Sequence, residues 1–315
     1  MNCLCCGKPL MTKDKSSGWH RSCIRHFFGT TSIPEIEIDD DMLECLASES
    51  INKGYTIPGV QRKLSLHLSA EGGKYRLTLV NYPTGYILKP QVTNFTALPE
   101  AEQLVMSMAD AVGIVTVPHA LVRGNGSLAY ITKRIDRVFV KKDVKLLAME
   151  DFCQLDLRLT QDKYKGSYER CAKIIDRYSS RRGLDLTELY MRLVFSYLVG
   201  NSDMHMKNVS LIEAEEGSGK YMLSPAYDLL PVNVVMPEDQ EQLALALNGK
   251  KRNLHKNDFF IFADECDISR SAAEKMIHKL VSMKQTMISM CNESLLPEEL
   301  KERMIALIEN RCSQI

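Results

Sequence analysis

Apolar and polar residues alternate along several short segments between residues 55 and 135. The stretches KLSLHLS at 63–69 and YRLTLVNY at 75–82 place apolar side chains at every second position, and the turn AEGGK joins them. A period of two is typical of strands that bury one face. Residues 85–90, 117–124 and 128–136 follow as further strands, so we predict a sheet of about five strands with one helix, at 98–113, inserted into it.

The spacing changes to that of helices after residue 145, where apolar side chains recur at intervals of three and four. One β-hairpin interrupts this region, because NVSLIEA and KYMLSPA flank the turn EEGSG. We therefore predict an α+β fold with a small β-rich N-lobe at 31–136 and a larger, mainly helical C-lobe at 137–315. The predicted helices cover residues 149–160, 167–180, 185–199, 256–265, 269–292 and 296–310.

Residues 1–30 form a separate Cys/His-rich unit in this prediction. A C-x2-C pair and an H-x2-C pair supply four candidate ligands for a tetrahedral zinc ion. Cys5 and His26 compete as ligands, so the alternative of a reduced cysteine-rich hook packed on the main domain stays open. Either role would be structural. The four candidate zinc ligands are Cys3, Cys6, His20 and Cys23.

Composition and charge narrow the class of protein. The chain has 315 residues, of which 45% are hydrophobic and 25% charged, as in ordinary globular proteins. Lys and Arg together number 40, as do Asp and Glu, so no net field draws the molecule to nucleic acid or membrane. No apolar run is long enough for a signal peptide or a membrane span, and six cysteines lie singly, so we expect a cytoplasmic protein without a membrane partner.

The stretch GNSDMHMKN, residues 200–208, follows the most apolar predicted helix and carries candidate chemistry. In phosphoryl transfer, an Asp orients the attacking hydroxyl, and an Asn a short turn later binds Mg²⁺. Asp203 and Asn208 have this spacing, and Lys207 between them is a second catalytic candidate. A further carboxylate must hold metal, and Asp228, directly after the predicted hairpin, is placed for that role.

The predicted sheet offers groups for nucleotide phosphates. Lys89 ends the apolar strand GYILK, and either Glu100 or Glu102 in the following helix can pair with it. The chain has no G-x-G-x-x-G motif. In its place stands YTIPGVQ, residues 55–61, where Gly59 lets backbone N–H groups approach phosphate and Thr56 adds a hydroxyl beside it.

Each of these residues also has a purely structural interpretation. Asp203 and Asn208 can belong to a helix end and turn, Lys89 can extend from a sheet edge, and Asp228 can cap a helix. The order of strand lysine, helix glutamate, loop Asp and Asn, hairpin and metal Asp favours a phosphotransferase.

Seven motifs in this order resemble the HipA-type serine/threonine kinases, which are bacterial toxins of toxin–antitoxin systems. They are YTIPGVQRKLSL, YILKP, LPEAE, YITKRIDR, MEDFCQL, GNSDMHMKN and LSPAYDLLP, and they lie between residues 50 and 235. The match extends more weakly to LALNGKKRNL. The resemblance implies a two-lobed, protein-kinase-like fold that uses ATP and Mg²⁺. Asp203 would be the catalytic acid, Asn208 and Asp228 the Mg²⁺ ligands, and Lys89 the phosphate-binding lysine.

The resemblance also implies regulation and partners. Thr56 stands where the family carries an autophosphorylated serine whose modification switches the kinase off. In the nucleotide site, Gln61 belongs to the phosphate loop, and backbone groups of Lys133 and Ile135 would meet adenine. The short segment before the phosphate loop is closer to the HipT-like toxins, whose missing N-terminal subdomain is a separate small HipS-like protein. A HipB-like antitoxin, DNA reached only through that antitoxin, and an aminoacyl-tRNA synthetase as substrate are the expected partners.

Two other functions stay open. One is a small-molecule phosphotransferase of the aminoglycoside or choline type, which shares the Asp and Asn loop and the metal Asp. The other is a non-catalytic, cysteine-rich regulator, for which the Cys/His-rich start and the basic triplet at 250–252 would be the signs.

Overall fold

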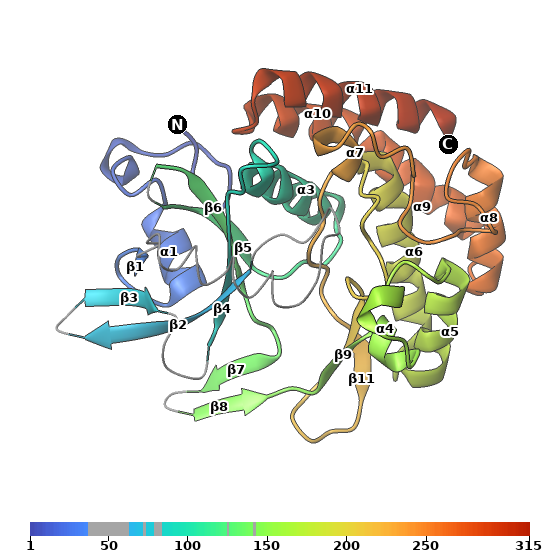
Figure 1. The fold of residues 1–315 in the computed structure, drawn as a ribbon, viewed down its shortest axis with the longest axis horizontal. Coiled ribbons are helices and arrows are strands. Elements are labelled where there is room, and N and C mark those ends of the chain that lie inside the picture. Colours follow the sequence, from blue (N-terminus) through green and yellow to red (C-terminus); the bar gives the residue numbers. More distant parts are fainter. Residues whose placement is uncertain (37–62, 72–73, 79–83, 125, 141–142) are drawn as a thin grey trace. The chain divides into compact units, whose positions relative to one another are not determined.

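The computed structural model describes residues 1–36, 63–71, 74–78, 84–124, 126–140 and 143–315 (Figure 1). The chain divides into two compact units. Unit 1 comprises Met1–Gln103 and Val117–Arg134, and unit 2 comprises Leu104–Thr116 and Ile135–Ile315. Helix α3 (Leu98–Val112) begins in unit 1 and ends in unit 2.

Unit 1 is built on a sheet that has six strands within the described residues, in the order β1-β3-β2-β4-β6-β5. Neighbouring strands are antiparallel, except that β1 and β3 are parallel. The alternation predicted for 63–69 is confirmed, since Leu64 and Leu66 are buried and Ser65 between them is exposed. The strands are β1 (Glu35–Ile36), β2 (Leu64–Glu71), β3 (Lys74–Thr78), β4 (Tyr86–Pro90), β5 (His119–Arg123) and β6 (Leu128–Lys133).

The first thirty residues pack onto this sheet through aromatic side chains. They contain a 3₁₀ turn (Thr12–Asp14) and helix α1 (Arg21–Phe28). Trp19 is fully buried, with its ring centroid 5.5 Å from that of Phe27 and 5.3 Å from that of Phe28. Its indole nitrogen donates to the carbonyl oxygen of Leu121 in β5 at 3.1 Å. Burying so large a ring contributes more to stability than any hydrogen bond around it.

Unit 2 is mainly helical and is centred on α6 (Arg182–Val199), whose last eleven residues are all buried. Helix α11 (Glu298–Gln314) packs against α6, and its Arg311 guanidinium donates to the Tyr197 carbonyl. The other helices are α4 (Phe152–Leu155), α5 (Tyr168–Tyr178), α7 (Val232–Val235), α8 (Lys256–Glu265), α9 (Arg270–Ser282) and α10 (Lys284–Glu293).

Two small sheets complete unit 2. The predicted hairpin is confirmed as β10 (Ser210–Glu213) and β11 (Tyr221–Leu223), and β9 (Met149–Asp151) pairs with the free side of β10. A second hairpin joins β7 (Arg137–Val140) to β8 (Asp143–Leu146), and neither strand was predicted. No helix in the described part of the chain is long and apolar enough to cross a membrane.

Two helix predictions were wrong. Residues 149–160 form β9 and then only the short α4, because Asp151 caps α4 and fixes its start at Phe152. Leu157, with φ of 54°, ends it. The segment 269–292 is broken at Met283, which ends α9 and begins α10.

Candidate functional site

The loop after α6 is closed by its own polar side chains. Gly200 ends α6 in the left-handed region, with φ of 74°, which a residue with a Cβ adopts at a cost. The buried Asn201 accepts a hydrogen bond from the Asp203 amide at 3.1 Å. The Asn208 side-chain nitrogen donates to the Asp203 carbonyl oxygen at 2.8 Å. The interval of five residues between Asp203 and Asn208 therefore closes the loop on itself.

Tyr164 contacts the carboxylate of Asp203. Its hydroxyl donates to Asp203 Oδ1 at 2.5 Å, and its ring packs edge-on against buried His205 with centroids 4.9 Å apart. His205 Nε2 lies 3.7 Å from the same oxygen. Burial, and then the negative charge of Asp203, raises the pKa of Tyr164 above its ordinary value. The tyrosine therefore stays protonated and holds the carboxylate as a hydrogen-bond donor.

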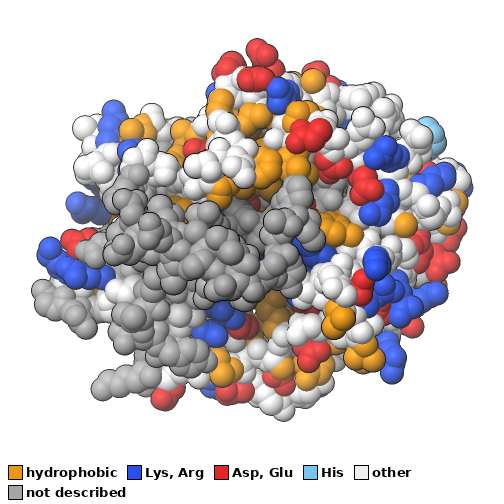
Figure 2. Space-filling model, viewed as in Figure 1, with side chains coloured by type: hydrophobic (Ala, Val, Ile, Leu, Met, Phe, Trp, Pro, Cys, Tyr) orange, Lys and Arg blue, Asp and Glu red, His pale blue; other side chains and the backbone are white. Residues whose placement is uncertain are grey.

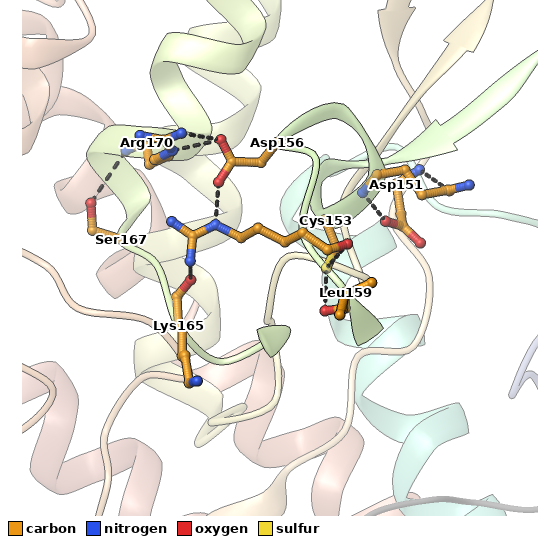
Figure 3. Close-up of polar contacts among 9 residues, drawn as sticks. Asp151, Cys153, Asp156, Leu159, Lys165, Ser167 and Arg170 are labelled. Atoms are coloured by element: carbon orange, nitrogen blue, oxygen red, sulfur yellow. Dashed lines mark hydrogen bonds and ion pairs between the residues drawn. The ribbon is translucent and has the colours of Figure 1, made fainter. Parts of the chain in front are cut away.

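A charged network fixes the segment that carries Tyr164. The Asp156 carboxylate binds the guanidinium groups of Arg158 and Arg170, and Arg158 also donates to the Lys165 carbonyl oxygen at 2.5 Å (Figure 3). Burial alone would raise the pKa of Asp156, but hydrogen bonds from the two arginines more than offset burial and lower it. The network ties the end of α4 to the start of α5, and Tyr164 lies between them.

Lys207 forms an ion pair with Asp151. Its ammonium lies 2.7 Å from Asp151 Oδ2, with about a third of the lysine side chain exposed. Asp151 uses its other oxygen to accept from the Gln154 amide and so caps α4 (Figure 3). In this arrangement Lys207 links the loop to β9 and α4.

Asp228 follows the β10–β11 hairpin in a left-handed backbone conformation, with φ of 55°. Asp tolerates this region better than most residues, and such strain concentrates at functional sites. The hydroxyl of the preceding Tyr227 lies 2.5 Å from Ser210 Oγ and donates to the Lys207 carbonyl oxygen at 3.2 Å. This hydrogen bond connects the segment that carries Asp228 to the loop that carries Asn208.

The phosphate-binding candidate of unit 1 is a buried ion pair. Lys89 of β4 binds Glu102 of α3, and their side chains are 2% and 1% exposed. Of the two glutamates that the sequence left open, Glu102 is the partner. The Lys89 ammonium also lies 5.1 Å from the ring centroid of Tyr130, its cross-strand neighbour on β6. Two buried charges are retained only when they compensate each other.

Of the remaining candidates for the nucleotide site, the structure describes Lys133 and Ile135 only. The Lys133 amide already donates to the Pro118 carbonyl oxygen at 3.0 Å. A contact of Lys133 with adenine would therefore have to use a group other than this amide. Ile135 begins the second segment of unit 2. Thr56, Gly59 and Gln61 lie outside the described residues.

The four predicted zinc ligands lie together in unit 1. Their ligand atoms are all within 4.8 Å of one another. Neither Cys5 nor His26, the two competitors, belongs to this group. The group consists of Cys3, Cys6, His20 and Cys23.

The basic triplet of the regulator alternative is largely used within the protein. Lys250 pairs with Asp258 at 2.8 Å, and Lys251 pairs with Glu241 at 3.1 Å. Figure 2 shows Lys and Arg side chains interspersed with Asp and Glu over the described part of one face. Two of the three basic side chains are therefore already paired with carboxylates of this chain.

Sequence reasoning missed three residues that shape the loop. Asn201 lies within GNSDMHMKN, residues 200–208, and the presence of a second Asn in this stretch could have drawn attention to it. Tyr227 precedes the metal candidate in the motif AYD. Tyr164 lies 39 residues before Asp203, and no spacing rule connects the two.

Comparisons with known proteins agree with this fold. The family model described as HipA-like C-terminal domain matches residues 55–287. In Sinorhizobium fredii, "Putative kinase Y4mE" is 29% identical over 235 residues and "Putative kinase Y4dM" is 32% identical over 232. These alignments cover 72% and 68% of this chain but only 54% of each relative, so the chain spans about half their length. A "Putative kinase" of Haemophilus influenzae is 24% identical, over 92% of this chain and 90% of that relative.

Two solved structures share the fold. The HipA–HipB–operator DNA complex of the Shewanella oneidensis toxin–antitoxin system matches with a TM-score of 0.70 and 19% identity, over 82% of this chain and 64% of that one. The Helicobacter pylori proinflammatory kinase CtkA matches with a TM-score of 0.53 and 16% identity, over 78% of this chain and 91% of that one. The predicted α+β, protein-kinase-like fold is confirmed.

Proposed function

This chain belongs to the HipA-like C-terminal domain family, and we propose that it is an ATP- and Mg²⁺-dependent protein kinase that phosphorylates serine or threonine. The observation that carries the proposal is the closed loop in which Tyr164 and Asn208 hold Asp203 from its side chain and its backbone. The names of the relatives support a kinase.

The residues present fit the cofactors of such a reaction. Asn208 uses its amide nitrogen inside the loop, so its oxygen is the atom suited to a metal ion. Together with the Asp228 carboxylate, it would offer oxygen ligands of the kind Mg²⁺ prefers. When bound, Mg²⁺ would neutralise charge on the transferred phosphate. We assign zinc no part in this reaction.

In this proposal each side chain has a separate task. Asp203 accepts the hydrogen bond of the attacking hydroxyl and orients it. Tyr164 keeps the carboxylate from rotating. Lys89, held by Glu102, binds nucleotide phosphate. Catalysis would come mainly from positioning and electrostatics, because the reaction leaves the protein little covalent work.

Regulation and partners follow from the family. We propose that Thr56 is autophosphorylated and that its modification switches the kinase off. A HipB-like antitoxin would be one partner, since the structural neighbour from Shewanella was solved with HipB and operator DNA. A small HipS-like protein would be a second, as the resemblance to the HipT-like toxins implies. The substrate would be a translation component such as an aminoacyl-tRNA synthetase.

Mass spectrometry after incubation with γ-labelled ATP and Mg²⁺ tests this proposal on the unmodified chain, Asp203→Asn and Thr56→Ala. Labelling at Thr56 that requires Asp203 supports both the kinase and the switch. Labelling elsewhere that requires Asp203 keeps the kinase and discards the switch. An unmodified chain that neither binds nor consumes ATP would overturn the proposal and favour the non-catalytic regulator. Labelling of an added aminoglycoside or choline, and not of protein, would favour the small-molecule enzyme.

A further inference from the structure

We propose that Cys3, Cys6, His20 and Cys23 bind one zinc ion, which fixes the N-terminal segment on the sheet of unit 1. The His20 Nδ1 atom lies 3.4 Å from the Cys6 sulfur and 3.8 Å from the Cys23 sulfur. A tetrahedral zinc ion, with Zn–S about 2.3 Å and Zn–N about 2.0 Å, separates its ligand atoms by roughly 3.4 to 3.8 Å. The two distances from His20 Nδ1 are therefore those of a zinc site, and all four ligand atoms lie within 4.8 Å of one another.

The second ring nitrogen of His20 determines which tautomer is present. His20 Nε2 lies 3.0 Å from the Pro9 carbonyl oxygen, which can only accept a hydrogen bond. Nε2 must then carry the proton, and Nδ1 presents its lone pair to the Cys6 and Cys23 sulfurs. A carbonyl that holds the outer nitrogen of a ligating histidine is a recurrent feature of zinc sites.

Backbone groups support the cysteines in the same way. The His20 amide donates to the Cys3 sulfur at 3.4 Å, which orients this sulfur within the group. The Gly7 amide donates to the Cys3 carbonyl oxygen at 2.9 Å, and Gly7 has φ of 70°, so the chain turns at the segment that carries Cys3 and Cys6. Three sulfurs and one imidazole suit zinc better than the hard cations that oxygen ligands select.

The segment that the zinc ion would close is attached to elements of unit 1 on both sides. The Leu4 carbonyl oxygen accepts from the Leu121 amide of β5 at 2.9 Å. The Cys5 carbonyl oxygen accepts from the Gln103 side chain of α3 at 3.3 Å. Gln103 is the neighbour of Glu102 and also contacts His119 Nδ1 at 2.8 Å. Loss of the metal would therefore loosen the contacts that the segment makes with β5 and α3.

Elemental analysis of the purified full chain tests the site without any nucleotide, so its outcome is independent of the kinase proposal. We expect one zinc per chain, and we expect Cys6→Ser and Cys23→Ser each to lose it. Cys5→Ser, the matched control in the same segment, should keep one zinc. Cobalt exchanged into the unmodified chain should give the visible bands of a tetrahedral thiolate site, which keeps the test decisive if a variant fails to fold.

Three results would overturn the proposal. The first is a chain with no zinc and no cobalt bands in which the three candidate cysteine ligands, Cys3, Cys6 and Cys23, react as free thiols or form disulfides. The second is stoichiometric iron in place of zinc. The third is zinc loss in Cys5→Ser as complete as in Cys6→Ser. A chelator that removes the zinc should also lower the unfolding temperature, because binding energy at a structural site is folding energy.

Discussion

The buried pair of Lys89 and Glu102 makes a measurable prediction about stability. Its side chains are 2% and 1% exposed, so removing one charge leaves the other in the interior of unit 1. Breaking a buried ion pair from one side costs about 3–5 kcal/mol. We therefore expect Glu102→Gln and Lys89→Met each to lower the free energy of unfolding by about that much, or the unfolding temperature by on the order of 10 °C.

The double variant separates the pair from the packing around it. Lys89→Met with Glu102→Gln removes both charges, and replacing a whole buried pair by neutral groups is often close to neutral. We expect the double variant to be more stable than either single variant, which gives a coupling free energy of about 2 kcal/mol or more. Urea unfolding followed by circular dichroism measures all four proteins.

An exposed ion pair in the same sheet serves as the matched control. Lys74 and Glu35 lie 3.4 Å apart with side chains 65% and 48% exposed, so Glu35→Gln should change stability by less than about 1 kcal/mol. If Glu102→Gln costs no more than Glu35→Gln, or if the two core substitutions are additive, the reasoning from burial is wrong.

Two further predictions concern the segment beside the loop. Tyr164→Phe should lower kcat about 10- to 100-fold, the contribution of a hydrogen bond to a charged group. Tyr178→Phe, at the exposed last residue of α5, should leave kcat unchanged. Equal rates for both variants would remove Tyr164 from the mechanism. Asp156 has a lowered pKa in the folded protein, so its contribution to stability is present above its ordinary pKa, about 3.9, and is lost as pH falls through the folded value. Asp156→Asn should therefore lower the unfolding temperature most near neutral pH and progressively less below about pH 4; a penalty independent of pH would contradict this.

The strands of unit 1 could be predicted because one face of each is buried. The side chains of Leu64 and Leu66 lie on the buried face of the sheet, and that of Ser65 lies on the exposed face. Because side chains alternate between the two faces of a strand, this arrangement is visible in the sequence as a period of two. The region 149–160 begins without such an alternation of apolar and polar residues. Its first three residues pair with β10, some sixty residues away, and this tertiary pairing overrides a pattern that locally favours a helix.

The hydrogen bond within the loop could be predicted from the sequence, whereas the contact of Tyr164 with the loop could not. Asp203 and Asn208 contact each other across five residues, so their interaction is visible as a spacing. Tyr164 reaches Asp203 only through the fold, from a segment held in place by Asp156 and its arginines. Local spacing therefore reveals the hydrogen bond between Asn208 and Asp203, whereas the position of Tyr164 depends on contacts between distant segments.

The most direct test of the proposed activity is the rate at which the chain removes the γ-phosphate of ATP with Mg²⁺ present. Asp203→Asn should lower this rate by at least about 100-fold, the usual contribution of a positioned acid–base group. Asp264→Asn, an exposed control on α8, should leave it unchanged, and both variants should unfold at the temperature of the unmodified chain. A folded Asp203→Asn variant that retains the rate within a few-fold would contradict the account.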